Sequence, residues 1–214
     1  MSYLVLPRGR SFVPVHVSDA RADEPLFANG LAAKKAPHFY PPYTGPRRAE
    51  LNGVQASGYV SRNHLILTGA VAGPIVTRPK TAAGGEIYSF GIDRGGASKT
   101  GPFPGRPWIR FDAVVNVTID SKGVTATVAA TVPMTNQPGV KPTKLDASAV
   151  SIKGDVVQVT VPLSALPSNG HAIDQWNVNF FARNPPLSGD FHSIASFTPD
   201  HTEFQIHVEH PPTS

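Results

Sequence analysis

The stretch "WIRFDAVVNVTIDSKGVTATVAATV", residues 108–132, alternates apolar and polar side chains on both sides of a short Ser-Lys-Gly segment. Successive side chains of a β-strand point to opposite faces, so this alternation is typical of strands buried on one face only. It predicts two long strands, joined by a tight turn at 121–123. Only Val114 interrupts the polar face of the first strand. Its apolar face is expected to be Ile109, Phe111, Ala113, Val115, Val117 and Ile119.

The same alternation recurs along the chain at intervals of about ten residues, which is the spacing of an all-β sandwich or barrel. Two more hairpins are predicted, one around Arg62-Asn63 and one around Gly154-Asp155. Isolated strands are predicted at 86–93, 175–183 and 202–209. No amphipathic helix of useful length follows residue 50, and the 22 Pro and 19 Gly residues favour turns over helix interiors.

Strands with one apolar and one polar face predict antiparallel sheets that each keep one side in water. The expected fold is therefore an all-β antiparallel sandwich, jelly-roll or immunoglobulin-like, with a long irregular N-terminal arm. We place the arm and a first strand in residues 1–50, the sandwich in 51–210 and a tail in 211–214. Residues 18–50 have no sustained period and hold at most a short helix near 26–35.

Composition narrows the class of protein more than it identifies a function. The net charge of +4 comes from scattered basic residues, which does not favour nucleic acid as a partner. The chain has no cysteine, so disulfides, thiolate metal sites and a cysteine nucleophile are excluded. No apolar run approaches the roughly 20 residues of a membrane span. The first residues do not form a signal peptide. An exported or extracellular location is nevertheless the favoured expectation.

The order of predicted strands resembles that of family-nine carbohydrate-binding modules and DOMON domains over residues 55–208. The resemblance is carried by "YSFGID", "WIRFDAVVNVTID", "GVTATVAATV", "GDVVQVTVPLSALP", "WNVNFFARN" and "FTPD". It implies a β-sandwich that binds either sugars or haem. The sugar binders use aromatic side chains and often contain structural calcium. The haem binders use an axial Met with His or Lys, and here Met134 would be that ligand, although a loop or core methionine is the simpler interpretation.

Sugar binding needs aromatic surface beside amide and carboxylate groups, because sugar C–H faces stack on rings and hydroxyls need hydrogen-bond partners. The stiff, Pro-rich loop 101–108 and the segment 38–46 supply rings, and the polar faces of two strands supply the other groups. For Trp176 the alternative is core packing, and for the two tyrosines it is an arm packed on the sandwich or on a neighbouring subunit. The candidate ligand-binding residues are Tyr40, Tyr43, Phe103, Trp108, Arg110, Asp112, Trp176, Asn177, Asn179 and Arg183.

A metal site is a further hypothesis, because five of the eight histidines fall after residue 170. Asp190 and His192 are two residues apart, as are His207 and Glu209, so each pair would share a strand face and could hold a transition metal. Polar alternation at a sheet edge gives the same residues without a metal. For calcium, "GIDRGG" and "SGDFH" are the candidate sources of oxygen ligands, without EF-hand spacing. We expect no cofactor, with calcium or a transition metal as the alternative and haem not favoured.

Catalytic motifs are missing from the sequence, which has no G-x-S-x-G, H-E-x-x-H, P-loop or dinucleotide fingerprint. A carboxylate pair for glycoside hydrolysis can meet only in space, and Glu86, Asp93 and Asp112 are the first candidates. The favoured function is a non-catalytic ligand-binding module, with a carbohydrate-like ligand. The alternatives are an assembly protein whose arm packs on a neighbouring subunit, a haem-binding DOMON-type domain and a small hydrolase. An arm that folds on its own sandwich would favour binding, and an extended arm would favour assembly.

Overall fold

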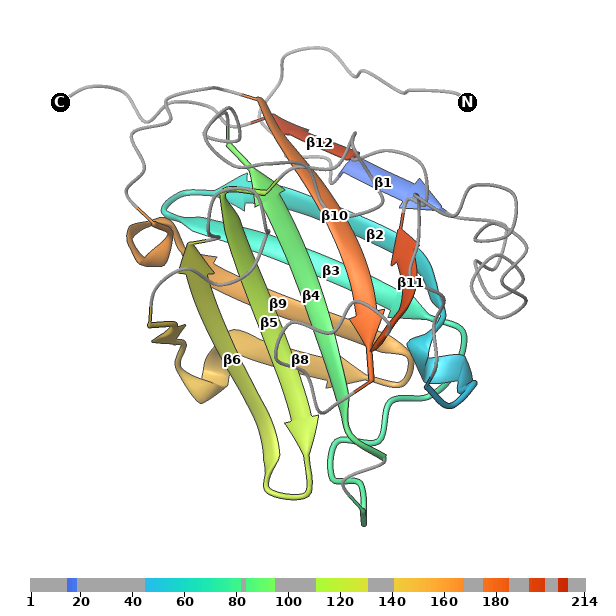
Figure 1. The fold of residues 1–214 in the computed structure, drawn as a ribbon. Helices are drawn as coiled ribbons and strands as arrows, with labels where there is room; N and C mark the ends of the chain where they lie inside the picture. Colours follow the sequence, from blue (N-terminus) through green and yellow to red (C-terminus); the bar gives the residue numbers. More distant parts are fainter. Residues whose placement is uncertain are drawn as a thin grey trace, which may run out of the picture.

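The computed structural model describes residues 15–18, 45–81, 84–94, 111–130, 141–167, 175–184, 193–198 and 204–207. These residues form an all-β sandwich, in which two antiparallel sheets lie face to face and their strands cross obliquely (Figure 1). The helices whose full bounds are described are the single 3-10 turns η1 (Ala49–Leu51), η4 (Ala147–Ala149) and η5 (Leu163–Ala165). None of the described helices is long and apolar enough to span a membrane.

Five strands form the first sheet, which we call sheet A, in the order β1-β2-β3-β9-β8. Its strands are β1 (Val15–Ser18), β2 (Gly53–Ser61), β3 (His64–Val71), β8 (Val150–Lys153) and β9 (Val156–Pro162). In β3 and β9, apolar buried residues alternate strictly with half-exposed ones. One face of sheet A therefore lies against the core and the other faces outward, as the period of two predicts.

Seven strands form the second sheet, sheet B, in the order β11-β10-β4-β5-β6-β7, with β12 also paired to β10. Strand β10 pairs with β11 along its second half and with β12 along its first half. The strands are β4 (Glu86–Asp93), β5 (Ala113–Asp120), β6 (Gly123–Ala130), β7 (Thr143–Lys144), β10 (Gln175–Arg183), β11 (Ile194–Thr198) and β12 (Phe204–His207).

The core between the sheets is centred on Phe180 of β10. Its ring centroid lies 5.0 Å from that of Phe90 and 6.0 Å from that of Tyr88, both on β4. On the opposite sheet, Gly69 of β3 has no side chain, and a Cβ placed there would lie 2.5 Å from the ring of Phe180. The sheets approach closely because a glycine faces a large ring.

The three predicted hairpins are confirmed. Ser61 pairs with His64 around Arg62-Asn63, and Lys153 pairs with Val156 around Gly154-Asp155. In the long hairpin Asp120 pairs with Gly123, so the turn consists of residues 121 and 122 and Gly123 already belongs to β6. Positive φ angles of 53° at Arg62 and 62° at Gly154 turn the chain tightly in the two shorter hairpins.

The start of the long strand was predicted wrongly. Strand β5 begins at Ala113 rather than at residue 109, because Asp112 forms a bend that reverses the side-chain order. Phe111 therefore lies on the outer face of sheet B, where its ring would contact any Cβ at Gly91. There it stacks on Phe181 with centroids 5.9 Å apart, and Val114 joins the same apolar cluster.

The alternation predicts that each sheet has an outer side in water. Sheet B differs from this prediction, because its outer side is only partly solvated. Its outer face carries a second apolar cluster separate from the central core. This cluster consists of Phe111, Val114, Ala129, Phe181, Ile194 and Phe197. Val114 interrupts the polar face of the long strand because it belongs to this outer cluster.

Two described pieces of the N-terminal segment lie on the sandwich. Strand β1 pairs with β2, with Val15 opposite Gly58. Farther along the chain, Leu51 is buried in the central core, and η1 spans the boundary placed at residues 50 and 51. The short helix predicted near 26–35 lies outside the described residues.

Candidate functional site

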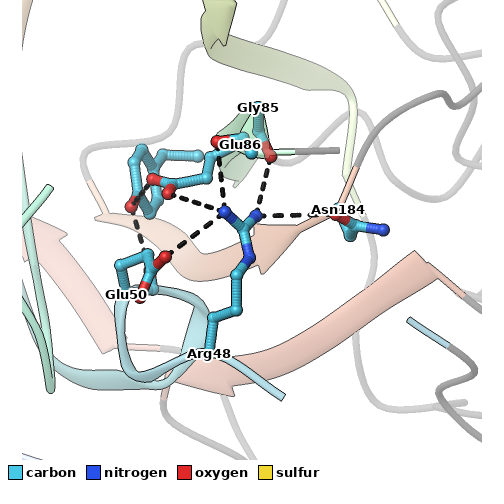
Figure 2. A network of polar contacts seen from close by, with 7 residues as sticks. Arg48, Glu50, Gly85, Glu86 and Asn184 are labelled. Atoms are coloured by element: carbon cyan, nitrogen blue, oxygen red, sulfur yellow. Dashed lines mark hydrogen bonds and ion pairs between the residues drawn. The ribbon is translucent and has the colours of Figure 1, made fainter. Parts of the chain in front are cut away.

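A polar cluster closes one end of the sandwich, where η1, the start of β4 and the residue after β10 meet (Figure 2). Arg48 is at its centre. Its Nη1 donates to the carbonyl oxygen of Gly84 at 3.1 Å, and its Nη2 donates to that of Gly85 at 2.8 Å. Nη2 also donates to Oδ1 of Asn184 at 3.5 Å. One guanidinium thus joins three segments that are far apart in the sequence.

Two carboxyl groups of unequal exposure face this guanidinium. Nη1 of Arg48 lies 3.2 Å from Oε1 of Glu50 and 3.4 Å from Oε1 of Glu86. The Glu50 side chain is 20% exposed, whereas that of Glu86 is 1% exposed. We call these three residues, together with Tyr88 and Asn184, the Arg48 cluster. It contains one cation and two acids, so its charge depends on whether Glu86 holds a proton.

Local structure fixes these groups in place. Arg48 precedes η1 in an extended conformation, and its carbonyl oxygen accepts a hydrogen bond from the N–H of Leu51 at 2.9 Å. Leu51 is buried in the core and anchors the turn. Glu86 and Tyr88 are two residues apart on β4, so their side chains lie on the same face of the strand.

The hydrogen bonds of Tyr88 indicate the protonation state of Glu86. The Tyr88 hydroxyl lies 2.9 Å from the carbonyl oxygen of Glu50 and also forms a hydrogen bond with Oε2 of Glu86. A phenol has only one hydrogen to donate. Both bonds form at once when Glu86 is protonated and donates to Tyr88, which then donates to Glu50.

Electrostatics agree with this assignment. Burial raises the pKa of Glu86 to about 7, against the smaller opposing effects of the Tyr88 hydroxyl and the Arg48 guanidinium. Burial also raises the pKa of Tyr88 well above its ordinary value, so its hydroxyl remains a neutral donor. Glu86 therefore exchanges its proton near neutral pH.

A buried ion pair lies beyond the other end of β4. Nε of Arg94 donates to Oδ1 of Asp112 at 2.7 Å, and the backbone N–H of Arg94 donates to Oδ2 at 2.6 Å. Asp112 is 1% exposed, and the Arg94 side chain is 8% exposed. The guanidinium carbon of Arg94 lies 6.0 Å from the ring centroid of Trp176. The bend at Asp112 and the start of β10 are thus joined through one arginine.

Glu86 lies too far from the other two candidate carboxylates, Asp93 and Asp112, to form a glycosidase pair with either. Asp112 donates its N–H to the carbonyl oxygen of Ile92, near the far end of β4. Ile92 lies six positions after Glu86 along the strand, which corresponds to about 20 Å. Glycosidase carboxylates lie roughly 5–10 Å apart. Glu86 therefore does not pair with Asp112, nor with Asp93 at the last position of β4.

The structure places four of the predicted ligand residues on β10 and separates them by face. Trp176 is 7% exposed and belongs to the central core, in agreement with the alternative of core packing. Asn177, Asn179 and Arg183 lie on the opposite face, as predicted. Asn179 is fully buried there, while Asn177 and Arg183 are half-buried. Asp112, expected on a polar strand face, is instead in the buried ion pair.

The remaining predicted site residues cannot be located in this arrangement. The ligand candidates Tyr40, Tyr43, Phe103, Trp108 and Arg110, the metal candidates Asp190, His192 and Glu209, and the haem candidate Met134 lie outside the described residues. His207 ends β12, and its side chain is likewise outside the described part. Within the part of the chain that the structure describes, no three His, Asp or Glu side chains gather to hold a metal ion.

The outer face of sheet A presents a different surface, which we call the neutral face. It lies on β2, β3 and β9, and all its side chains are half-exposed. Cross-strand register aligns Ser57, Thr68 and Gln158 in one row and Tyr59, Ile66 and Thr160 in the next. Nε2 of Gln158 donates to Oγ1 of Thr68 at 3.2 Å. A third row completes the neutral face with Gln55, Ala70 and Val156.

Arg48, Glu50 and Arg94 were not identified as site residues from the sequence. Arg48 lies at the end of an arm without periodicity, and its partners other than Glu50 are 36 or more residues away. One signal was present: Glu86 occupies a core-facing strand position, where a carboxyl group needs a buried partner. A search for such out-of-place charges would have selected Glu86, although not its arginine.

Comparisons of the chain with protein-family models, with curated proteins and with solved structures found no match.

Proposed function

We propose that this protein is a non-catalytic binding module that holds a neutral carbohydrate on the neutral face of sheet A. The observation that supports the proposal is the chemistry of that face. Its three rows carry hydroxyl, amide and apolar groups and no charged side chain. A charged side chain borders these rows, because the exposed Lys153 on β8 lies opposite Val156. Within the rows, sugar hydroxyls find uncharged donors and acceptors.

The geometry of the rows suits a flat ligand. Neighbouring strands are about 4.8 Å apart, so the three strands present a regular lattice of side chains. Ser57, Thr68 and Gln158 supply hydrogen-bonding groups, and Tyr59 and Ile66 supply surface for the C–H faces of a sugar. The resemblance of the sequence to family-nine carbohydrate-binding modules favours the same ligand class.

The outer face of sheet B is a weaker candidate for the ligand site. Asn179 is 0% exposed, and the rings of Phe111 and Phe181 in its apolar cluster are also buried. Of the predicted ligand residues on β10, only Asn177 and Arg183 reach solvent to a useful degree. These two residues supply the control for the proposed site.

The described pieces of the N-terminal segment favour a binding module over an assembly protein. Strand β1 pairs with β2 of the same chain, and residues 48–51 are bound through Arg48 and Leu51. A segment that is held by its own sandwich in two places is less suited to reach across a neighbouring subunit.

Changing Tyr59→Ala together with Gln158→Ala should weaken retention on neutral polysaccharides by roughly tenfold or more, since each side chain contributes about 1 kcal/mol. The measurement is affinity electrophoresis through gels containing a panel of soluble β-glucans, xylan and mannan. Retention of the parent should change little with salt, because the contacting groups of the three rows are uncharged.

The matched control is Asn177→Ala with Arg183→Ala, which changes the outer face of sheet B and should leave retention unchanged. A loss of retention in the control but not in the Tyr59 variant would move the site to sheet B. No retention of the parent on any neutral polysaccharide would end the proposal.

A further inference from the structure

The Arg48 cluster has a chemical feature that ligand binding does not use. In the described structure, the ionisable groups that face Glu86 are Arg48 and Glu50 from the segment before β2, and Tyr88 from its own strand. On the adjacent strand β5, the residue opposite Glu86 is Ile119, which cannot titrate. A single proton therefore decides whether Arg48 faces one carboxylate or two.

With Glu86 protonated, the cluster is balanced. Arg48 carries the positive charge and Glu50 the negative one, at 3.2 Å. Glu86 donates to the Tyr88 hydroxyl, and Tyr88 donates to the carbonyl oxygen of Glu50. That last bond connects η1 directly to β4, so the chain of donors holds residues 48–51 against the sandwich.

Loss of the proton changes the direction of this chain. A buried carboxylate is a stronger acceptor than a backbone carbonyl, so Tyr88 turns its only hydrogen to Glu86. The carbonyl oxygen of Glu50 then loses its donor. Two carboxylates now share one guanidinium, and one of them is almost completely buried, which is unfavourable.

We propose that the Arg48 cluster is a proton-operated latch that holds residues 48–52 on β4 while Glu86 is protonated and releases them when Glu86 loses the proton. Release exposes the edge of the central core at Leu51 and frees the segment that leads from the N-terminal part of the chain into β2. The latch does not depend on the proposed function, because none of its residues belongs to the neutral face.

The pH range follows from the direction of the shift. The pKa of Glu86 in the folded protein, about 7, lies above the ordinary value of 4.5, so the folded state holds the proton more tightly than the unfolded state. The stabilising contribution is complete below pH 4.5 and is lost as the pH rises to 7 and slightly above. The latch is therefore closed in mild acid and open in mild alkali.

Hydrogen exchange tests the latch at the amides of Leu51 and Asn52, which donate to Arg48 and Ala49 within η1. Between pH 5.5 and pH 8, their protection factors, corrected for intrinsic exchange, should fall by roughly tenfold to a hundredfold. Amides at the centre of the β5–β6 hairpin should keep their protection.

Two variants separate the latch from a general loss of stability. Glu86→Gln keeps a donor for Tyr88 and an acceptor for Arg48 without a titrating proton, so protection should stay high at both pH values. Tyr88→Phe removes the donor to Glu50, so protection at Leu51 and Asn52 should be low at both.

Three results would overturn the proposal. The first is protection in the parent that does not change between pH 5.5 and pH 8. The second is an equal fall across the β5–β6 hairpin, which would mean that the whole fold weakens. The third, independent of any variant, is an NMR titration in which the side-chain carboxyl carbon of Glu86 shows an ordinary pKa near 4.5.

Discussion

Replacing Asp112 by alanine should lower the free energy of unfolding by about 3–5 kcal/mol, because it leaves Arg94 buried without its partner. The carboxylate of Asp112 accepts from both the side chain and the backbone N–H of Arg94, at 2.7 and 2.6 Å. Water does not replace the lost acceptor when the site stays closed, since Asp112 is 1% exposed. Urea denaturation monitored by Trp fluorescence and by circular dichroism measures the loss.

A double-mutant cycle with Arg94→Met isolates the pairwise interaction. With both charges gone, much of the penalty should disappear, so the double variant should be more stable than Asp112→Ala alone. Asp155→Ala is the matched control, because Asp155 is exposed in the β8–β9 turn and its loss should cost less than about 0.5 kcal/mol. A loss at Asp112 no larger than at Asp155 would contradict the buried pair.

Changing Gly69→Ala should destabilise the protein by about 3 kcal/mol, because the added methyl group enters the ring of Phe180. The nearest three atoms of that ring would lie 2.5, 2.6 and 2.8 Å from the new Cβ, which is too close for any side chain. Both residues lie inside elements of different sheets, so neither can move without disturbing the core. Thermal and urea unfolding give the magnitude.

The companion variant Phe180→Leu shows whether the clash has the stated cause. Leucine is smaller than phenylalanine, so adding Gly69→Ala to Phe180→Leu should cost far less than it costs in the parent. If Gly69→Ala is as harmful in the Phe180→Leu background as in the parent, the two residues do not face each other across the sandwich.

Much of the fold was predictable because the strands are two-faced and the turns are short. Alternation located β2 to β6, β8 to β10 and β12, and turn residues such as Gly154 marked the hairpins. Strand β11 was missed because all five residues of "IASFT" are buried, so it shows no alternation. Strand β7 has only two residues, which is too short for any period.

The wrong start of β5 has a physical explanation that the sequence obscures. Phe111 and Ala113 keep the period of two on paper, but the bend at Asp112 turns them to opposite faces. The bend is stabilised by Arg94, 18 residues earlier, so no local signal reveals it. The outer apolar cluster similarly combines residues from several strands, of which only Val114 appeared out of place.

The candidate sites were less predictable than the fold, because their partners are distant in sequence. Sequence alone placed Asn177, Asn179 and Arg183 correctly on the face opposite Trp176. It could not show that Asn179 is buried, since burial on the outer face depends on packing over sheet B. The neutral face was implicit in the polar positions of β2, β3 and β9, but its rows exist only once the register is known.

The central claim is that the neutral face of sheet A carries the ligand, and NMR mapping tests it most directly. Titration of the ¹⁵N- and methyl-labelled protein with a neutral oligosaccharide should shift resonances of Tyr59, Ile66, Thr68 and Gln158. Resonances of Asn177 and Arg183 on sheet B should stay in place. Shifts confined to sheet B would contradict the account. So would the absence of any shift with oligosaccharides of β-glucan, xylan and mannan.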